Sequence, residues 1–127
     1  MPKKGILMTH IPGSVMIKNL TRNTVITKDH SVYSSTLQKA MGLMLTLRPK
    51  AIVMDFSPSQ IVSLHMFLVF YPIDVIGLDN SKNVVSLKRT FRPCSIYSTP
   101  KPVRYVLELP SGSIHLSNTR VGDRITF

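Results

Sequence analysis

Short apolar runs separated by polar turns make up most of the chain after residue 15, and this pattern is typical of β-strands. Residues 73–78 and 84–89 are apolar runs on either side of the polar segment DNSKN, which predicts a hairpin. The other predicted strands are two short runs within 15–27, then 51–56, 63–70, 103–109 and the segment that follows Gly122.

Residues 31–45 are different, because their apolar positions recur at helical spacing. Ser35 followed by Gln38 matches the capping-box pattern of a helix start, and Gly42 suits a helix end. A single helical turn is also expected after the turn PSGS, which ends at residue 113.

Short strands with Pro and Gly turns between them favour a mostly β fold, a compact β-sandwich or barrel-like single domain with one or two short helices. We expect that domain to cover residues 15–127 and residues 1–14 to form a flexible leader. The longest apolar run, residues 61–78, contains Pro72 and Asp74. A carboxylate inside a bilayer is costly, so we interpret this run as buried strands and expect no membrane span.

The charge balance adds a class of partner to this picture. Sixteen Lys and Arg residues against six Asp and Glu residues give a net charge of +10, which attracts RNA, DNA or an anionic membrane surface. Cys94 is the only cysteine, which excludes an intramolecular disulfide and fits a reducing, cytoplasmic location. The four histidines form no HxH or HxxxH pattern, so we expect no metal site and no cofactor.

Five motifs occur together in one order: GLM at 42–44, HMFLVFYPIDVIGLD at 65–79, VV at 84–85, RYVLELPSG at 104–112 and VGDRI at 121–125. Over residues 16–127 the chain resembles the family called domain of unknown function 192, or uncharacterised protein family 0127, and its short archaeal members in particular. The resemblance implies a compact β fold and no established activity. The family commonly has Trp at the position of His65 and polar residues where this chain has Phe67, Leu68 and Val69.

The candidate residues for binding a small ligand or a partner are His65, Asp74, Cys94, Tyr97 and Glu108. Asp74 lies beside Pro72 in the most apolar part of the chain, and two roles fit it. It is either a base with a raised pKa or a buried anchor that accepts N–H bonds where the strand bends. We favour the anchor, which also leaves Asp74 able to form the floor of a pocket.

The other candidates also have a structural alternative. His65 is either a general acid or base paired with Asp74 or a histidine satisfied in the core, and we favour the core role. Lys88 and Arg92 flank Cys94 and would lower its thiol pKa, although a nucleophilic cysteine also needs a partner base. For Glu108, which precedes Pro110 in an apolar strand, we expect a buried and hydrogen-bonded side chain.

Residues 88–105 interleave aromatic and basic side chains, as surfaces that stack single-stranded bases do. The alternative, which we favour, is an ordered proline-rich loop whose rings pack on the sheet. The candidate nucleic-acid residues are Lys88, Arg89, Phe91, Arg92, Lys101 and Arg104.

Two functions remain, and an enzyme ranks below both. The sequence has no GxxxxGK[ST] or GxSxG motif and no strand–GxGxxG–helix unit, and no complete catalytic constellation can be identified in it. We expect a non-enzymatic β domain that binds a small ligand or a protein partner in a concavity near His65, Asp74 and the loop 91–102. The alternative is a nucleic-acid-binding module that uses the basic stretch 88–104.

Overall fold

The computed structural model describes residues 16–35, 38–39, 42–44 and 48–127. The strands are β1 (Ile17–Asn19), β2 (Thr24–Thr27), β3 (Ser31–Tyr33), β4 (Ile52–Gln60), β5 (Ser63–His65), β6 (Ile73–Leu78), β7 (Val84–Phe91), β8 (Ile96–Ser98), β9 (Val103–Pro110) and β10 (Ile125–Thr126). The short helix α2 covers Ser113–Ser117, where one helical turn was predicted. The mostly β fold is therefore confirmed. No helix in the described part of the chain is long and apolar enough to cross a membrane.

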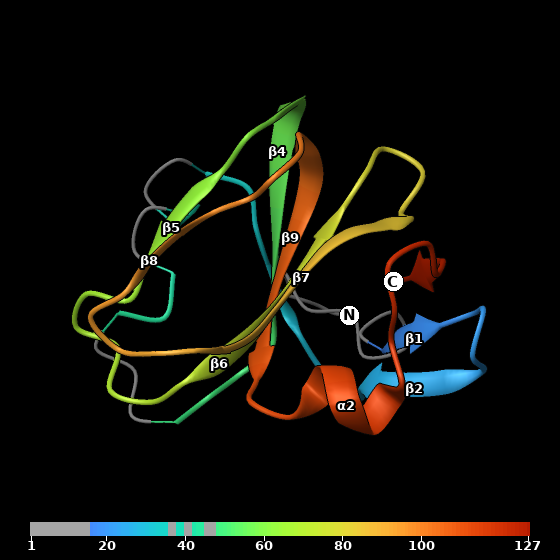
Figure 1. The fold of residues 1–127 in the computed structure, drawn as a ribbon, viewed down its shortest axis with the longest axis horizontal. Helices are drawn as coiled ribbons and strands as arrows, with labels where there is room; N and C mark the ends of the chain where they lie inside the picture. The colour runs from blue at the N-terminus through green and yellow to red at the C-terminus, as the bar shows by residue number, and fades with distance from the viewer. Residues whose placement is uncertain (1–15, 36–37, 40–41, 45–47) are drawn as a thin grey trace, which may run out of the picture.

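A five-stranded sheet with the strand order β3-β4-β9-β6-β7 forms the centre of the molecule (Figure 1). Its strands pair antiparallel, except that β3 and β4 are parallel. The strands β3 and β7 lie at opposite edges, so the described part of the sheet stays open and does not close into a barrel. The prediction left a sandwich and a barrel open, and the described residues form the sandwich.

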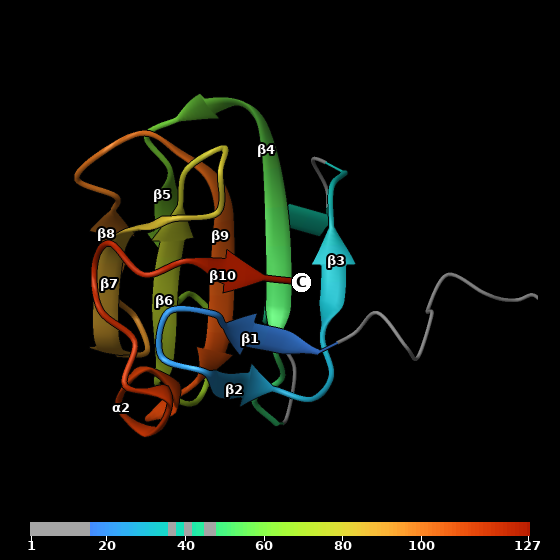
Figure 2. The same cartoon turned by 90° about the vertical axis from the view of Figure 1, so that its right-hand side faces the viewer.

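Two smaller sheets cover the two faces of the central sheet (Figure 2). The β5–β8 ribbon covers one face, and the sheet β10-β1-β2 together with α2 covers the other. Side chains alternate along a strand, so β6 directs Ile73 and Val75 to the ribbon and Ile76 and Leu78 to the opposite cover. We call the cluster around Ile73 and Val75 the ribbon-side core, and the cluster around Ile76 and Leu78 the helix-side core.

The helix predicted over 31–45 begins later than expected. Ser31–Tyr33 form β3, because they pair in parallel with β4. The capping box is present: the Gln38 N–H donates to Ser35 Oγ at 3.1 Å, and the Ser35 N–H donates to Gln38 Oε1 at 3.4 Å. The Gly42 N–H donates to the Gln38 carbonyl at 2.9 Å, and Gly42 has a φ of +50°, as at a helix end. Part of this predicted helix lies outside the described residues, namely positions 36–37, 40–41 and 45. The predicted leader over 1–14 lies outside them as well.

The predicted hairpin is confirmed as β6 and β7, which pair antiparallel around a turn that begins at Asp79. Asp79 Oδ1 accepts N–H bonds from Ser81 and Asn83, both at 2.9 Å. A carboxylate that accepts N–H bonds from residues further along its own turn is the reason that Asp favours such positions.

The prediction for the segment before the hairpin was too long. The expected strand 63–70 ends at His65, because the Val69 N–H donates to the Met66 carbonyl at 3.3 Å and closes a turn. The segment 91–102, expected to be a loop, contains β8, which pairs with β5. These two short strands form the ribbon that covers one core.

Candidate functional site

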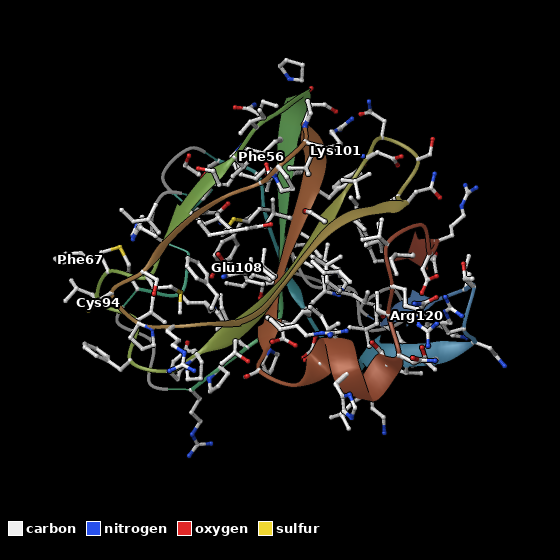
Figure 3. The ribbon with its side chains drawn as sticks, viewed as in Figure 1. Phe56, Phe67, Cys94, Lys101, Glu108 and Arg120 are labelled. Atoms are coloured by element: carbon white, nitrogen blue, oxygen red, sulfur yellow. The ribbon has the colours of Figure 1, made fainter. Side chains whose placement is uncertain are left out.

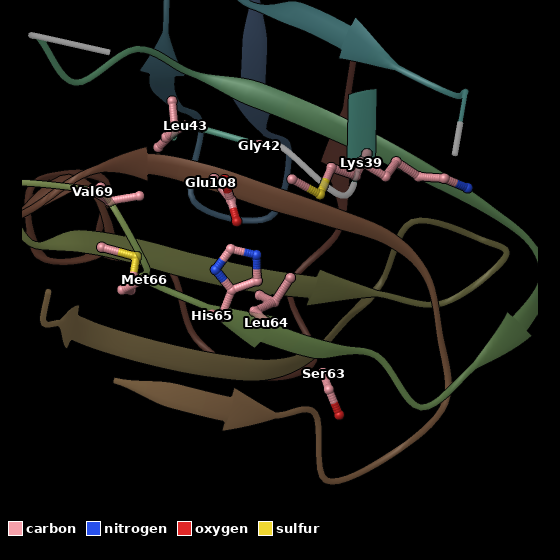
Figure 4. A pocket seen from close by; sticks show the side chains of 10 residues that line it. Lys39, Gly42, Leu43, Ser63, Leu64, His65, Met66, Val69 and Glu108 are labelled. Carbon is pink, nitrogen blue, oxygen red and sulfur yellow. The ribbon is translucent and has the colours of Figure 1, made fainter. Parts of the chain in front are cut away.

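A cavity of about 160 Å³ lies beside β5 in the ribbon-side core (Figure 4). Among the described strands β5 pairs only with β8, and its three residues line the cavity together with Lys39, Gly42 and Leu43. The cavity is lined by the apolar side chains of Leu43, Met54, Leu64, Met66 and Val69 and by Lys39, Gly42, Ser63, His65 and Glu108.

Glu108 is a buried carboxyl group in the wall of this cavity. The strand β9 lies between β4 and β6, with Glu108 opposite Ile52 on one side and Val75 on the other. The alternation of β9 sends Leu107 and Leu109 into the helix-side core and leaves Glu108 on the ribbon side. Glu108 is 5% exposed, and its carboxyl group has no hydrogen-bond or salt-bridge partner among the described residues.

Burial raises the pKa of Glu108 from 4.5 to about 7, because a carboxylate loses its hydration in an apolar environment. Near neutral pH the group therefore exchanges between an acid that can donate a hydrogen bond and a carboxylate that only accepts. Its burial agrees with the prediction from sequence. The predicted hydrogen bond is absent among the described residues, so the carboxyl group remains available to a molecule that enters the cavity.

Gly42 lines the cavity close to this carboxyl group. A Cβ atom at position 42 would lie 3.4 Å from Glu108 Oε1 and 3.3 Å from Met54 Cε. The φ of +50° is also in the left-handed region, which side chains other than that of glycine adopt with strain. Glycine therefore serves two purposes here: it ends the helical segment and it leaves space beside Glu108.

His65 and Lys39 are the two basic residues of the lining. His65 Nδ1 accepts the Phe67 N–H at 3.1 Å, which places the proton of the neutral ring on Nε2. Figure 4 shows the His65 ring and the Glu108 carboxyl group directed into the same space. Lys39 Nζ donates to the Asp55 carbonyl at 2.9 Å and lies 4.4 Å from the centre of the Phe56 ring, so its charge is held by β4 and not by Glu108.

Asp74 lies on the other face of the central sheet and is 1% exposed. Its Oδ1 accepts the Thr90 N–H at 3.0 Å, and its Oδ2 accepts the N–H groups of Gly112 at 3.1 Å and Ile114 at 2.9 Å. The carboxylate therefore joins β6 to the end of β7 and to the start of α2. Among the described residues, the cavity that contains His65 does not include Asp74, because β5 covers one face of the central sheet and Asp74 lies on the other.

Tyr97 lies on β8 and Cys94 lies in the turn before it, and neither residue lines the cavity described above. Cys94 is exposed in the turn before β8, with a φ of +62°. Tyr97 packs on the ribbon-side core, where its ring and that of Phe91 meet edge to face with centres 5.9 Å apart. Phe91 itself is 1% exposed, so the expectation that its ring stacks on nucleic-acid bases does not fit this structure.

The predicted basic residues are spread over several elements. Lys88 and Arg89 lie on β7, Arg92 follows β7, and Lys101 precedes β9. Arg104 Nε donates to Asp55 Oδ1 across β9 and β4 at 2.7 Å, so this cation is already paired. No cluster of three or more His, Cys, Asp or Glu side chains among the described residues is arranged to hold a metal ion.

The profile of the DUF192 family, described as "Uncharacterized ACR", matches residues 18–127. The chain belongs to the DUF192 family. A UPF0127 protein from Thermococcus sibiricus is 35% identical over 113 residues, which are 87% of this chain and 73% of the relative. The family was thus identified correctly from the ordered motifs.

Two solved structures share this DUF192 fold. A protein of unknown function from Novosphingobium aromaticivorans matches with a TM-score of 0.79 and 15% identity, over 94% of this chain and 91% of that one. A protein from Sinorhizobium meliloti, provisionally named a transcription regulator, matches with a TM-score of 0.77 and 22% identity, over 87% and 88% of the two chains. At these identities the likeness concerns the fold.

Of the ten described residues that line the cavity of this DUF192 chain, His65 and Glu108 were candidates from the sequence, and the other eight include Lys39 and Gly42. Lys39 and Gly42 belong to the segment after β3, which is far from Glu108 in sequence. The signal for Gly42 was its place in the GLM motif at 42–44, where a helix end explained the glycine equally well. For Lys39 the sequence carried no signal, because an exposed lysine on a helix is common.

Proposed function

We propose that this protein is a non-enzymatic binding domain whose small ligand occupies the cavity beside Glu108. The observation that carries the proposal is the buried Glu108 carboxyl group, which has no partner among the described residues. Burying a polar group without a partner costs free energy, and a ligand that supplies the missing hydrogen bond recovers it. The single cysteine supports a reducing, cytoplasmic location for this activity.

The cavity defines the chemistry of that ligand. A volume of about 160 Å³ suits a small body of ring size, since apolar cavities of roughly this size accept benzene. The apolar walls of Leu43, Met54 and Leu64 favour a hydrocarbon body, and Glu108 favours an amine or hydroxyl donor on it. We therefore expect a compact apolar amine or alcohol.

Two observations weigh against the alternative function, nucleic-acid binding through residues 88–104. The ring of Phe91 is buried in the ribbon-side core, and Arg104 is paired with Asp55. A surface that stacks bases needs exposed rings next to unpaired cations.

Benzylamine, benzyl alcohol and benzoate test the proposal, because they share a ring and differ in charge. We expect amide NMR shifts at Gly42, His65 and Glu108, with benzylamine binding tightest and benzoate weakest at pH 8. The Glu108→Gln variant should lose the preference for the amine. The matched control is Asp79→Asn, whose amide oxygen still accepts the turn N–H bonds outside the cavity. An unchanged ranking in Glu108→Gln, or no shifts around the cavity, would refute the proposal.

The pKa of Glu108 adds a second test. If only the ionised carboxylate pairs with benzylamine, a pKa of about 7 predicts about tenfold weaker binding at pH 6 than at pH 8. Benzyl alcohol should show no such loss. Equal affinity of benzylamine at both pH values would contradict a role for the Glu108 carboxylate.

A further inference from the structure

Three large apolar side chains are exposed on β8 and on the segment that follows β5. Phe67 is 61% exposed, Phe70 is 65% exposed and Ile96 is 80% exposed. Phe67 lies in the turn after β5, Phe70 follows that turn, and Ile96 begins β8. We call these three residues the apolar tip. Figure 3 shows Phe67 next to Cys94 at one end of the long axis of the molecule.

The apolar tip is held by backbone hydrogen bonds between two loops. The Met66 N–H donates to the Ser95 carbonyl at 2.9 Å, and the Cys94 N–H donates to the Met66 carbonyl at 3.1 Å. His65 pairs directly with Ile96. Met66 and Val69 of the same segment are buried in the ribbon-side core, so the exposed Phe67 and Phe70 are not the residues that anchor the loop.

The surroundings of the apolar tip are positively charged. Arg92 is exposed in the same turn as Cys94, and its carbonyl accepts the Ser95 N–H at 3.3 Å. Arg48 is also exposed, and its carbonyl accepts the Tyr71 hydroxyl at 3.1 Å. The sequence has no Asp or Glu between residues 56 and 73 or between 80 and 107.

The acidic residues elsewhere do little to offset this charge. Of the six in the chain, Asp74, Glu108 and Asp123 are buried, and Asp55 is paired with Arg104. The surface therefore carries most of the excess positive charge of the chain, whose net value is +10. Two copies that met through their tips would bring Arg92 and Arg48 of both copies together, which opposes self-association.

We propose that the apolar tip inserts into the surface of an anionic lipid membrane. Exposed apolar side chains that protrude at one end, without hydrogen-bonding groups of their own, fit the acyl boundary of a bilayer. The arginines beside them fit the negatively charged headgroups. The contact is peripheral and uses two loops, not a spanning segment.

Cys94 provides a direct test, because it is the only cysteine and lies beside Phe67. The protein labelled there with a nitrobenzoxadiazole fluorophore is mixed with vesicles of equal parts phosphatidylcholine and phosphatidylglycerol. We expect a brighter, blue-shifted emission that weakens with added salt, and no change with phosphatidylcholine alone. The control carries the label on α2, as Cys94→Ser/Leu116→Cys, and should not respond. No response at Cys94, or equal responses at both positions, would overturn the proposal.

Substitutions distinguish insertion of the apolar tip into the membrane from a general attraction between the positive protein and the anionic lipids. Phe67→Ser/Phe70→Ser should reduce co-sedimentation with the anionic vesicles by about tenfold or more, since insertion buries both rings. The matched control Leu116→Ser/Val121→Ser removes two side chains that are 83% and 62% exposed elsewhere and should bind as the original protein does. Equal binding of both double variants would overturn the proposal. Binding of an oligouridine RNA through Phe67 and Phe70 without vesicle binding would also overturn it.

Discussion

Asp74 and Glu108 are both buried carboxyl groups of the central sheet, and they have opposite environments. They lie on adjacent strands, one register position apart, because Asp74 pairs with Leu109 and Val75 pairs with Glu108. Asp74 faces the helix-side core and accepts three backbone N–H bonds. Glu108 faces the ribbon-side core and has no partner among the described residues.

The comparison shows that burial alone does not define the role of a carboxyl group. The N–H donors of Asp74 replace the water that the carboxylate lost on folding, so its charge stabilises the fold. Glu108 lost the same water without replacement, and burial raises its pKa to about 7. The first arrangement connects elements of the fold, and the second leaves a polar group for a ligand.

Removing the Asp74 carboxylate should give the largest effect. Asp74→Ala leaves the N–H groups of Thr90, Gly112 and Ile114 without their acceptor, and we expect a loss of at least about 3 kcal/mol in the free energy of unfolding. Urea denaturation measures this loss. Asp74→Asn is the control, because it retains one acceptor oxygen and should lose less. A midpoint of Asp74→Ala equal to that of the original protein would show that Asp74 is not an anchor.

Neutralising Glu108 should raise the free energy of unfolding at pH 8, whereas Asp74→Ala lowers it. Its folded pKa of about 7 lies above the unfolded value of 4.5, so the protonated group is favourable in the fold below pH 4.5 and this advantage is lost as the pH rises to 7. The difference corresponds to on the order of 3 kcal/mol as an upper limit. Glu108→Gln should therefore be more stable than the original protein at pH 8 and similar to it at pH 4. Lower stability of Glu108→Gln at pH 8 would mean that the carboxylate has a stabilising partner.

Filling the space beside Glu108 should give an intermediate effect. In Gly42→Ala the new Cβ atom approaches Glu108 Oε1 and Met54 Cε, and the positive φ adds strain of about 1 kcal/mol. We expect weaker benzylamine binding together with a small decrease in Tm. Gly122→Ala is the matched control, because Gly122 also has a positive φ and a Cβ atom added there would meet no described atom within 4 Å. Equal benzylamine affinity in both variants would indicate that the ligand does not occupy this wall.

The half-buried ion pair of Asp55 and Arg104 should show the smallest effect. Its side chain and that of its partner Arg104 are 32% and 30% exposed, and water replaces a partner at such a site. Arg104→Ala should therefore change Tm least in this series. A decrease in Tm as large as that of Asp74→Ala would remove the distinction between the buried Asp74 carboxylate and the half-buried Asp55 carboxylate.

The sequence predicted the burial of both carboxyl groups, since Asp74 and Glu108 interrupt apolar strands. It did not predict their different partners, because these depend on elements that are distant in the chain. The donors to Asp74 come from Thr90 and from the start of α2, and the space beside Glu108 depends on Gly42. Local pattern therefore defined the strands and the hairpin, whereas the site depended on β5 and on Lys39, Gly42 and Leu43 meeting Glu108 across the fold.

Phe91 illustrates the same limit. Its place among basic residues resembled a base-stacking surface, yet the β-strand alternation that the same sequence contains sends it into the ribbon-side core. The exposed rings are instead Phe67 and Phe70, which lie where a strand was expected to continue to residue 70. A turn that closes between Met66 and Val69 ends this strand early and exposes them.

Glu108 is the only glutamate in the chain, so selective ¹³C labelling of glutamate carboxyl groups gives one resonance that belongs to it. The most direct measurement follows this resonance against pH, first alone and then with benzylamine. We expect a midpoint near 7 for the protein alone, and a clearly lower midpoint with benzylamine because the ammonium group favours the ionised carboxylate. A midpoint near 4.5 would show that Glu108 is solvated or paired, and a midpoint that benzylamine does not move would show that the cavity does not bind it.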